Sequence, residues 1–154
     1  MAKPDTADVI APPPLIVLAG LLAGYGLDFL WPAPSLPNEF GYPLGVLLGV
    51  TGLAAALPAL RGFRRAGTSP EPWHPSTALV TEGLYKYTRN PMYVGLTLIY
   101  LAIAAAFGGA WLLAMLLPTL ATLHYGVILR EERYLDAKFG EAYRAYKASV
   151  RRWL

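Results

Sequence analysis

Four long apolar stretches, separated by short polar segments, constrain the fold of this 154-residue chain more than any other feature. A helix needs roughly 20 mainly apolar residues to cross the hydrocarbon core of a bilayer, which is about 30 Å thick. The stretches approach that length, and 55% of the residues are hydrophobic while only 15% are charged. The sequence therefore predicts one all-α integral membrane domain over residues 1–154, with spans at 15–30, 44–60, 92–107 and 111–129.

The positions of Lys and Arg predict how these spans are oriented. With an even number of spans, both termini and the loop at 61–90 lie on one side, and that side carries all 13 Lys and Arg residues. Such residues accumulate on the cytoplasmic side of membrane proteins. We therefore expect a multi-pass protein of the cytoplasmic (inner) membrane with cytoplasmic N- and C-termini. A basic face against anionic lipid headgroups explains the net charge of +3 without a nucleic-acid partner.

Glycine positions predict how the spans pack. Gly20 and Gly24 lie in the first span, and Gly45 and Gly49 in the second, at a spacing that lets helix backbones approach one another in membranes. The third and fourth spans are separated only by Gly108–Gly109, which predicts an antiparallel hairpin with almost no external loop. We therefore expect the functional residues in the longer segments at the opposite end.

The end of the loop at 61–90 alternates aromatic with basic residues and leads into the third span at Asn90-Pro91. Asn90 is a candidate N-cap, and Pro91 a candidate first helical residue. A helix that begins there presents free backbone N–H groups and the positive end of its dipole beside Arg89, which suits an anion. Ordinary interfacial anchoring by basic and aromatic side chains explains the same residues equally well.

The segment after the fourth span predicts an interfacial amphipathic helix over residues 131–150. Its apolar residues, among them Leu135, Phe139 and Tyr143, recur at helical spacing with basic residues between them. The segment opens with the adjacent carboxylates of Glu131–Glu132. These are candidate site residues, although ion pairs in the headgroup region explain them as well.

Three blocks of sequence occur in order around the predicted hairpin, at Leu79–Tyr85, Arg89–Tyr93 and Glu131–Val150. Together they resemble the isoprenylcysteine carboxyl methyltransferase family, which is related to the membrane phospholipid methyltransferases. The resemblance covers roughly residues 66–152. The first two spans match this family only as membrane helices.

This resemblance implies an integral membrane methyltransferase that uses S-adenosylmethionine and acts on a lipophilic or lipid substrate. It implies a cofactor pocket on the cytoplasmic side, formed by the loop, the start of the third span and the segment after the fourth. It also implies a set of cofactor-binding positions, to which the helix-start argument adds Arg89. They are Thr77, Ala78, Leu79, Val80, Tyr85, Asn90, Pro91, Met92, Tyr93 and Glu131.

The chemical groups of S-adenosylmethionine have candidate partners among these residues. The helix start at Asn90–Met92 suits the carboxylate, and Glu131 suits the ammonium or the ribose hydroxyls. Tyr85 and Tyr93 suit the adenine ring or the sulfonium. Methyl transfer by direct displacement needs in-line positioning and no metal ion. We accordingly predict no metal site, because the chain offers two His and no Cys as ligands of that kind.

Two departures from the family pattern bear on the substrate. Asn90 replaces a His of the eukaryotic prenylcysteine enzymes, and Val127 replaces an Arg that holds the substrate carboxylate in those enzymes. Arg130, in the next turn, is a candidate substitute for that Arg. An amine acceptor must instead lose a proton, for which Glu132 or His124 is the candidate base. Carboxyl O-methylation of a prenylcysteine-like molecule and methylation of a lipid amine both stay open.

Two other functions stay open as well. A sterol-reductase-like enzyme that uses NADPH has similar C-terminal blocks, but this chain is short and has Leu96 where that family has Asp. A non-enzymatic membrane scaffold or transporter subunit is the third alternative. It predicts no cofactor binding and tolerance of substitutions at Tyr93 and Glu131.

Overall fold

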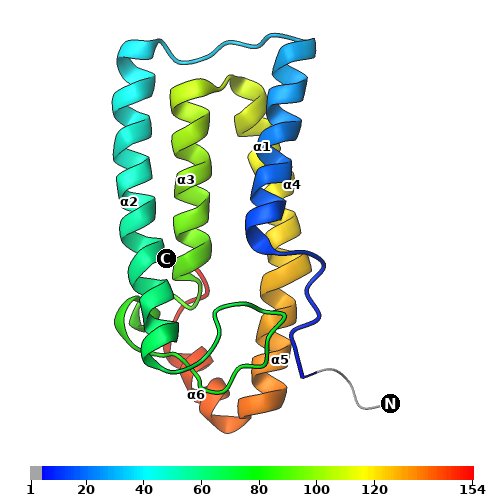
Figure 1. Ribbon diagram of the computed structural model, residues 1–154, viewed down its shortest axis with the longest axis vertical. Helices are drawn as coiled ribbons and strands as arrows, with labels where there is room; N and C mark the ends of the chain where they lie inside the picture. Colours follow the sequence, from blue (N-terminus) through cyan, green and yellow to red (C-terminus); the bar gives the residue numbers. More distant parts are fainter. Residues whose placement is uncertain (1–4) are drawn as a thin grey trace.

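The computed structural model describes residues 5–154 and contains helices but no strand within that range. Long helices run side by side along the longest axis of the molecule (Figure 1). A short 3-10 helix at Gly83–Lys86 lies in the connection between the second and third of them. The α-helices are α1 (Pro13–Leu30), α2 (Asn38–Arg65), α3 (Pro91–Phe107), α4 (Ala110–Leu123), α5 (Leu129–Phe139) and α6 (Glu141–Ser149).

The lengths and the apolar composition of these helices identify the chain as a membrane protein. The helices α1 and α2 and the continuous run Ala110–Phe139 are each long and apolar enough to cross a bilayer. The apolar helix α3 is shorter, with 17 residues, which is about the minimum for a span. Large apolar side chains such as Phe29, Leu47 and Leu117 are exposed on the outside of the bundle, where a bilayer would cover them.

The ends of the helices differ from the predicted spans in two places. The predicted span at 44–60 lies within the longer helix α2, which continues through Pro43 and Pro58. The helix that contains the fourth predicted span continues beyond residue 129, because a π-helical turn at His124–Ile128 joins α4 directly to α5. The predicted helix at 131–150 is instead divided at Gly140, whose φ of +54° is easily adopted by glycine alone.

Close backbone approach joins the helices in two pairs. A Cβ atom added to Gly52 of α2 would lie 2.9 Å from the carbonyl oxygen of Gly95 in α3. One added to Gly24 of α1 would lie 2.9 Å from Cα of Leu112 in α4. Small residues thus bring α2 against α3 and α1 against α4, as their spacing predicted. Gly20 and Gly45 lie at similarly close contacts, whereas Gly49 does not.

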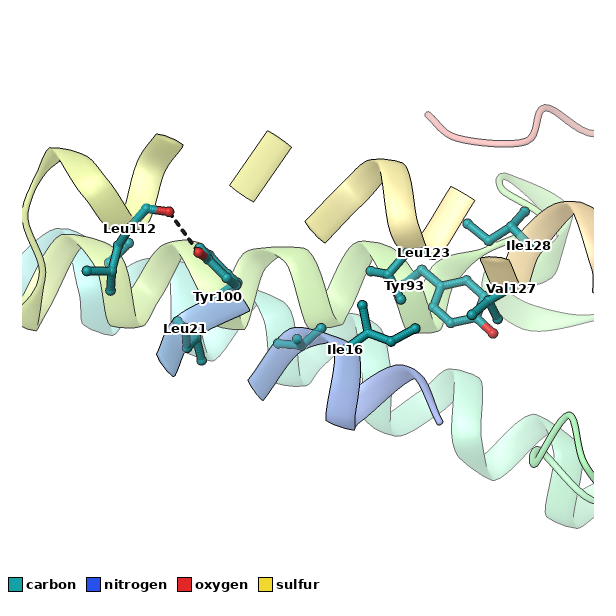
Figure 2. Close-up of a cluster of buried hydrophobic side chains, with 10 residues drawn as sticks. Ile16, Leu21, Tyr93, Tyr100, Leu112, Leu123, Val127 and Ile128 are labelled. Atoms are coloured by element: carbon teal, nitrogen blue, oxygen red, sulfur yellow. Dashed lines mark hydrogen bonds between the residues drawn. The ribbon is translucent and has the colours of Figure 1, made fainter. Parts of the chain in front are cut away.

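A buried cluster connects α1, α3, α4 and the π-helical turn (Figure 2). Tyr100 is 0% exposed at its centre, and its hydroxyl donates a hydrogen bond to the carbonyl of Leu112 over 2.8 Å. This bond satisfies a polar group that is otherwise surrounded by hydrocarbon. The cluster ends at Tyr93 and Ile128, so the apolar core leads directly to the end of the bundle that carries α5 and α6 (Figure 1). We call this end the polar end.

Both termini of the described chain pack at the polar end. The N-terminal segment at 5–12 bonds to the loop and to the π-helical turn, through Ala7 N to Pro72 O (3.1 Å) and Ile10 N to Gly126 O (3.2 Å). The C-terminal segment, residues 150–154, turns back toward the start of α3. There the Arg89 amide donates to the carbonyl of Arg151 over 2.9 Å. Segments distant in sequence therefore meet around the start of α3.

Candidate functional site

A cavity opens at the polar end between the N-terminal segment, the loop after α2, the start of α3, and α5 with α6. Its empty volume is about 850 Å³, including the part that is open to solvent. The loop, the start of α3 and α5 are the three segments that the sequence predicted to form a pocket. The predicted residues in its lining are Ala78, Leu79, Val80, Tyr85, Arg89, Asn90, Met92, Tyr93, Glu131 and Glu132.

Four candidate residues lie outside this lining. Thr77 supports the loop, because its amide donates to Oγ1 of Thr68 over 2.9 Å. Pro91 is fully buried as the first residue of α3. The Arg130 guanidinium donates to the carbonyl of Asp8 over 2.7 Å, away from the cavity. His124 lines a second, apolar pocket beside the first.

The closest polar contact between α3 and α5 in the cavity wall joins Tyr93 to Glu131. The Tyr93 hydroxyl donates to Oε1 of Glu131 over 2.7 Å. A carboxylate accepts several hydrogen bonds, so the remaining acceptor positions of Glu131 are available to a ligand with N–H or O–H donors. The pair thus fixes a buried carboxyl group at a defined position in the cavity.

Glu132, the second carboxylate of the pair, is surrounded by cations. Arg152 donates to it through Nε and Nη2, each over 2.8 Å, in the two-point geometry that guanidinium and carboxylate groups favour. Nη1 of Arg89 lies 3.3 Å away and Nζ of Lys147 lies 3.8 Å away. A carboxylate held in this way is poorly suited to act as a general base. Its contacts instead attach the C-terminal segment to α5.

Arg89 carries unsatisfied donors at the cavity. Its side chain is 9% exposed, and neither Nε nor Nη1 donates a hydrogen bond within residues 5–154. Buried donors without partners are costly, at about 1–3 kcal/mol each. The ion pair with Glu132 offsets part of this cost, and an anionic ligand in the cavity would supply the missing acceptors. These donors are compatible with the anion site predicted beside the start of α3, which stays a prediction.

Asn90 starts α3 where the sequence predicted, but its side chain does not cap the helix. Nδ2 of Asn90 donates instead to the carbonyl of Arg152, over 2.9 Å. The backbone of the C-terminal segment offers an acceptor at a position that the sequence does not reveal. Because no side chain caps α3, the first amides of the helix keep their donors for a ligand.

Three tyrosines form further parts of the cavity wall. The Tyr146 hydroxyl donates to the carbonyl of Tyr85 over 2.8 Å, which ties α6 to the loop. Burial raises the pKa of Tyr85 and of Tyr146 well above the ordinary value, and it raises the pKa of Tyr143 to about 12. The three hydroxyls therefore stay protonated at neutral pH, so these side chains offer aromatic faces and neutral donors.

Sequence reasoning did not select Tyr143, Tyr146 or Arg152 as site residues. The two tyrosines were visible as part of an apolar helical face, but nothing marked that face as the side of a cavity. Arg152 has no local signal, since its role depends on the return of the C-terminal segment to α5.

The structure was also searched for metal ligands. No group of three or more Asp, Glu or His side chains in residues 5–154 is placed to hold an ion.

Comparison with known families identifies the family of this chain. Residues 40–142, about two thirds of the chain, match the model of the phospholipid methyltransferase family. The chain belongs to the phospholipid methyltransferase family. The part that matches this methyltransferase family runs from α2 to the start of α6 and contains Arg89, Tyr93 and Glu131. It leaves out α1, most of α6 and the C-terminal segment.

One relative matches a part of the chain. A protein of Haemophilus influenzae described as "Uncharacterized protein" is 45% identical over 65 residues, which make up 41% of this chain and 100% of that protein. No solved structure matches the chain. The family match is therefore the comparison that indicates a reaction class for this methyltransferase family member.

Proposed function

We propose that the protein is an S-adenosylmethionine-dependent methyltransferase that acts on a lipophilic substrate in the membrane. The observation that carries the proposal is the meeting of unsatisfied buried Arg89 donors and the Tyr93–Glu131 pair in one cavity. Membership of the phospholipid methyltransferase family supports the reaction class. A prenylcysteine-like carboxylate and a lipid amine are the two acceptors that the sequence left open.

The lining of the cavity fits the charged ends of the cofactor. S-adenosylmethionine carries a carboxylate, which suits Arg89 and the free amides at the start of α3. Its ammonium and ribose hydroxyls are donors, which suit the open acceptor positions of Glu131. When bound, the cofactor supplies an electrophilic methyl group on a sulfonium.

Aromatic side chains complete the binding site in this proposal. Tyr85 packs edge-on against Phe63, with ring centroids 5.7 Å apart, which holds its ring in the cavity wall. Aromatic faces bind an adenine ring by stacking and a sulfonium by cation–π attraction. Tyr93 has the same capacity, in addition to its bond with Glu131.

The chain contributes positioning and exclusion of water rather than a covalent nucleophile. Holding two reactants in line supplies roughly 7–11 kcal/mol of the barrier reduction in well-oriented systems. We assign no step of the reaction to Glu132, whose carboxylate is held by Arg152, or to Arg130, which faces Asp8. For an amine acceptor, His124 is the remaining candidate for the group that takes the proton.

We further propose that the polar end faces the cytoplasm in the cytoplasmic (inner) membrane. Every Lys and Arg within residues 5–154 comes from the last turns of α2 or from segments that gather at this end (Figure 1). This one-sided distribution follows the positive-inside rule. In that orientation the cavity opens toward the compartment that contains S-adenosylmethionine.

The proposal is tested by calorimetric titration of the detergent-purified protein with S-adenosylmethionine and with its demethylated product. We expect saturable binding to the wild type, and at least about tenfold weaker binding to Arg89→Gln and Glu131→Gln, since a hydrogen bond to a charged group contributes about 1.5–3 kcal/mol. Arg130→Gln is the matched control, because it removes a guanidinium outside the cavity.

Absence of binding to a folded wild type would overturn the proposal and favour the scaffold alternative. Equal losses in Arg130→Gln and Arg89→Gln would show that the effect is one of overall charge or stability rather than of contact in the cavity. Thermal unfolding in detergent identifies any variant that fails to fold.

A further inference from the structure

The first described residues cross the cavity at the polar end, from the loop after α2 to α5, and we call residues 5–8 the strap. Ala7 lines the cavity and is 5% exposed. Its amide donates to the carbonyl of Pro72, another lining residue, over 3.1 Å. Two residues earlier, Asp5 contacts Tyr134 of α5, which belongs to the same lining. The strap therefore connects two walls of the cavity, on the side of α5 in Figure 1.

The residues that follow the strap are held by apolar packing. Val9 and Ala11 pack against the buried cluster. The Ile10 amide donates to the carbonyl of Gly126 over 3.2 Å, and its side chain lies so close to Gly126 that there is no room for a Cβ atom at that glycine. This part of the N-terminal segment is therefore anchored to the bundle.

The strap itself is held mainly by polar contacts at exposed positions. Nζ of Lys138 lies 2.6 Å from Oδ2 of Asp5, whose side chain is 59% exposed. Arg130 lies 3.6 Å from the carboxylate of Asp8, whose side chain is 88% exposed. Exposed ion pairs contribute little to stability, and Ala7, the one buried residue of the strap, buries a single methyl group. The strap is thus a segment of low local stability beside an anchored one.

The boundary between these two parts is a bend in the backbone at Asp8. Its φ is +49°, a conformation that residues with a side chain seldom adopt, although Asp tolerates it better than most. Such a conformation persists where the surrounding contacts impose it. The flanking backbone bonds of Ala7 and Ile10 do so here, and release of the strap relieves the strain.

The Tyr134 hydroxyl couples the strap to the loop. It accepts hydrogen bonds from the amide of Ser76, over 2.9 Å, and from Nζ of Lys138, over 3.1 Å. It donates to Asp5, whose backbone carbonyl and Oδ1 both lie 3.2 Å away. Ser76 also lines the cavity. The contacts that hold the strap in place therefore also hold a second part of the cavity wall.

We propose that the strap is a lid, which opens to admit a water-soluble ligand into the cavity and closes over it. The inference rests on the proposed function for the identity of that ligand, S-adenosylmethionine. Asp5, Asp8 and Lys138 lie outside the cavity lining, so their contacts hold the lid without touching the ligand. Such contacts stabilise the closed lid equally with and without ligand. Their loss therefore speeds exchange in both directions and leaves the equilibrium affinity unchanged.

The first test measures access to the cavity without S-adenosylmethionine. Ala78→Cys places a single cysteine in the lining of the detergent-purified protein, which has none of its own. The probe is a negatively charged methanethiosulfonate. We expect Asp5→Asn and Lys138→Gln each to accelerate its reaction about two- to fivefold, the range that loss of an exposed ion pair allows. The two variants change the charge in opposite directions, so acceleration by both excludes attraction of the probe as the cause.

Matched variants assign this effect to the strap. Arg144→Gln removes the same charge as Lys138→Gln, from an exposed ion pair with Asp136 that joins α5 to α6, and is expected to leave the rate unchanged. Tyr134→Phe keeps the ring but releases both the strap and the loop, so we expect it to accelerate the reaction at least as much as Lys138→Gln. Unchanged rates in Asp5→Asn and Lys138→Gln, or equal acceleration by Arg144→Gln, would overturn the proposal.

A second reporter excludes general loosening of the protein. Ala142→Cys, exposed on α6 outside the lining, is expected to react at the same rate with and without Lys138→Gln. Acceleration at Ala142→Cys equal to that at Ala78→Cys would overturn the assignment to a lid.

The second test follows the release of bound radiolabelled S-adenosylmethionine. We expect Lys138→Gln to speed release by the same factor as the cysteine reaction and to leave Kd unchanged, and an unchanged rate of release would overturn the lid. Accelerated labelling in a protein that does not bind S-adenosylmethionine would overturn the methyltransferase function alone. Binding of S-adenosylmethionine with labelling rates that ignore the strap variants would overturn the lid alone.

Discussion

Individual side chains at the polar end divide into those that face the cavity and those that hold its walls together. Arg89, Tyr93 and Glu131 face the cavity with donors or acceptors that their neighbours leave unsatisfied or partly used. Arg152 and Glu132 satisfy one another, and their contact secures the C-terminal segment. Adjacent carboxylates in the sequence thus have different environments, because successive residues of a helix point about 100° apart.

Replacing Arg152 tests this division at the residue scale. We expect Arg152→Ala to lower the free energy of unfolding by about 1–3 kcal/mol, because it removes a two-point partner from a buried carboxylate while Arg89 still compensates part of the charge. Lys147→Ala is the control, since its amine lies 3.8 Å from Glu132 and is half-exposed, and about 0.5 kcal/mol is expected. Thermal unfolding in detergent measures both, and equal effects would contradict the assigned role of Arg152.

At the scale of elements, one residue decides where the helix that contains the fourth predicted span ends. The helix continues through the π-helical turn and α5 until Gly140, where a φ of +54° reverses the chain into α6. This reversal brings Tyr143 and Tyr146 over the cavity. A straight helix to residue 150 would have carried them away from it.

Gly140→Ala is therefore expected to destabilise the protein by about 1–3 kcal/mol, because a side chain is strained at this φ. Gly26→Ala in α1 is the matched control. A Cβ there meets nothing within 4 Å, and alanine favours a helix by about 1 kcal/mol over glycine. Comparison of the two unfolding temperatures in detergent checks the prediction, which a stable Gly140→Ala protein would refute.

The contact between α2 and α3 offers a second test among the elements. A Cβ at Gly95 would lie 2.8 Å from the carbonyl oxygen of Gly52, whereas one at Gly49 would lie 3.6 Å from Cβ of Ala102. We expect Gly95→Ala to cost about 1–3 kcal/mol through overpacking, and Gly49→Ala to be close to neutral. Thermal unfolding in detergent measures the stability of both variants. Similar stability of the two would mean that the helices separate without cost.

For the molecule as a whole, the charge distribution predicts its orientation. The chain has no cysteine, so single cysteines report on sidedness without background. In right-side-out membrane vesicles, we expect a membrane-impermeant maleimide to label Ser35→Cys, in the connection between α1 and α2. Lys147→Cys, in α6 at the polar end, should react only after permeabilisation. The reverse pattern would place the cavity on the opposite side and contradict the cytoplasmic assignment.

The sequence alone determined the membrane class, the helical hairpin and the start of α3, and it selected ten of the 22 residues that line the cavity. These features depend on local composition, on Pro and Gly positions and on blocks that resemble a family. All of these signals come from residues that are close together in the sequence. Phospholipid methyltransferase family membership follows from the same local information. The sequence alone did not determine the partners of Asn90, Arg130 or Glu132.

Those partners come from segments distant in sequence. Asn90 and Glu132 contact Arg152, and Arg130 contacts Asp8, so each contact requires the chain ends to fold back onto the polar end. The second pocket likewise exists only where α3, the π-helical turn and Trp153 come together. Periodicity and motifs describe residues a few positions apart, whereas these contacts were decided by tertiary packing, because only packing brings separate segments within hydrogen-bonding distance.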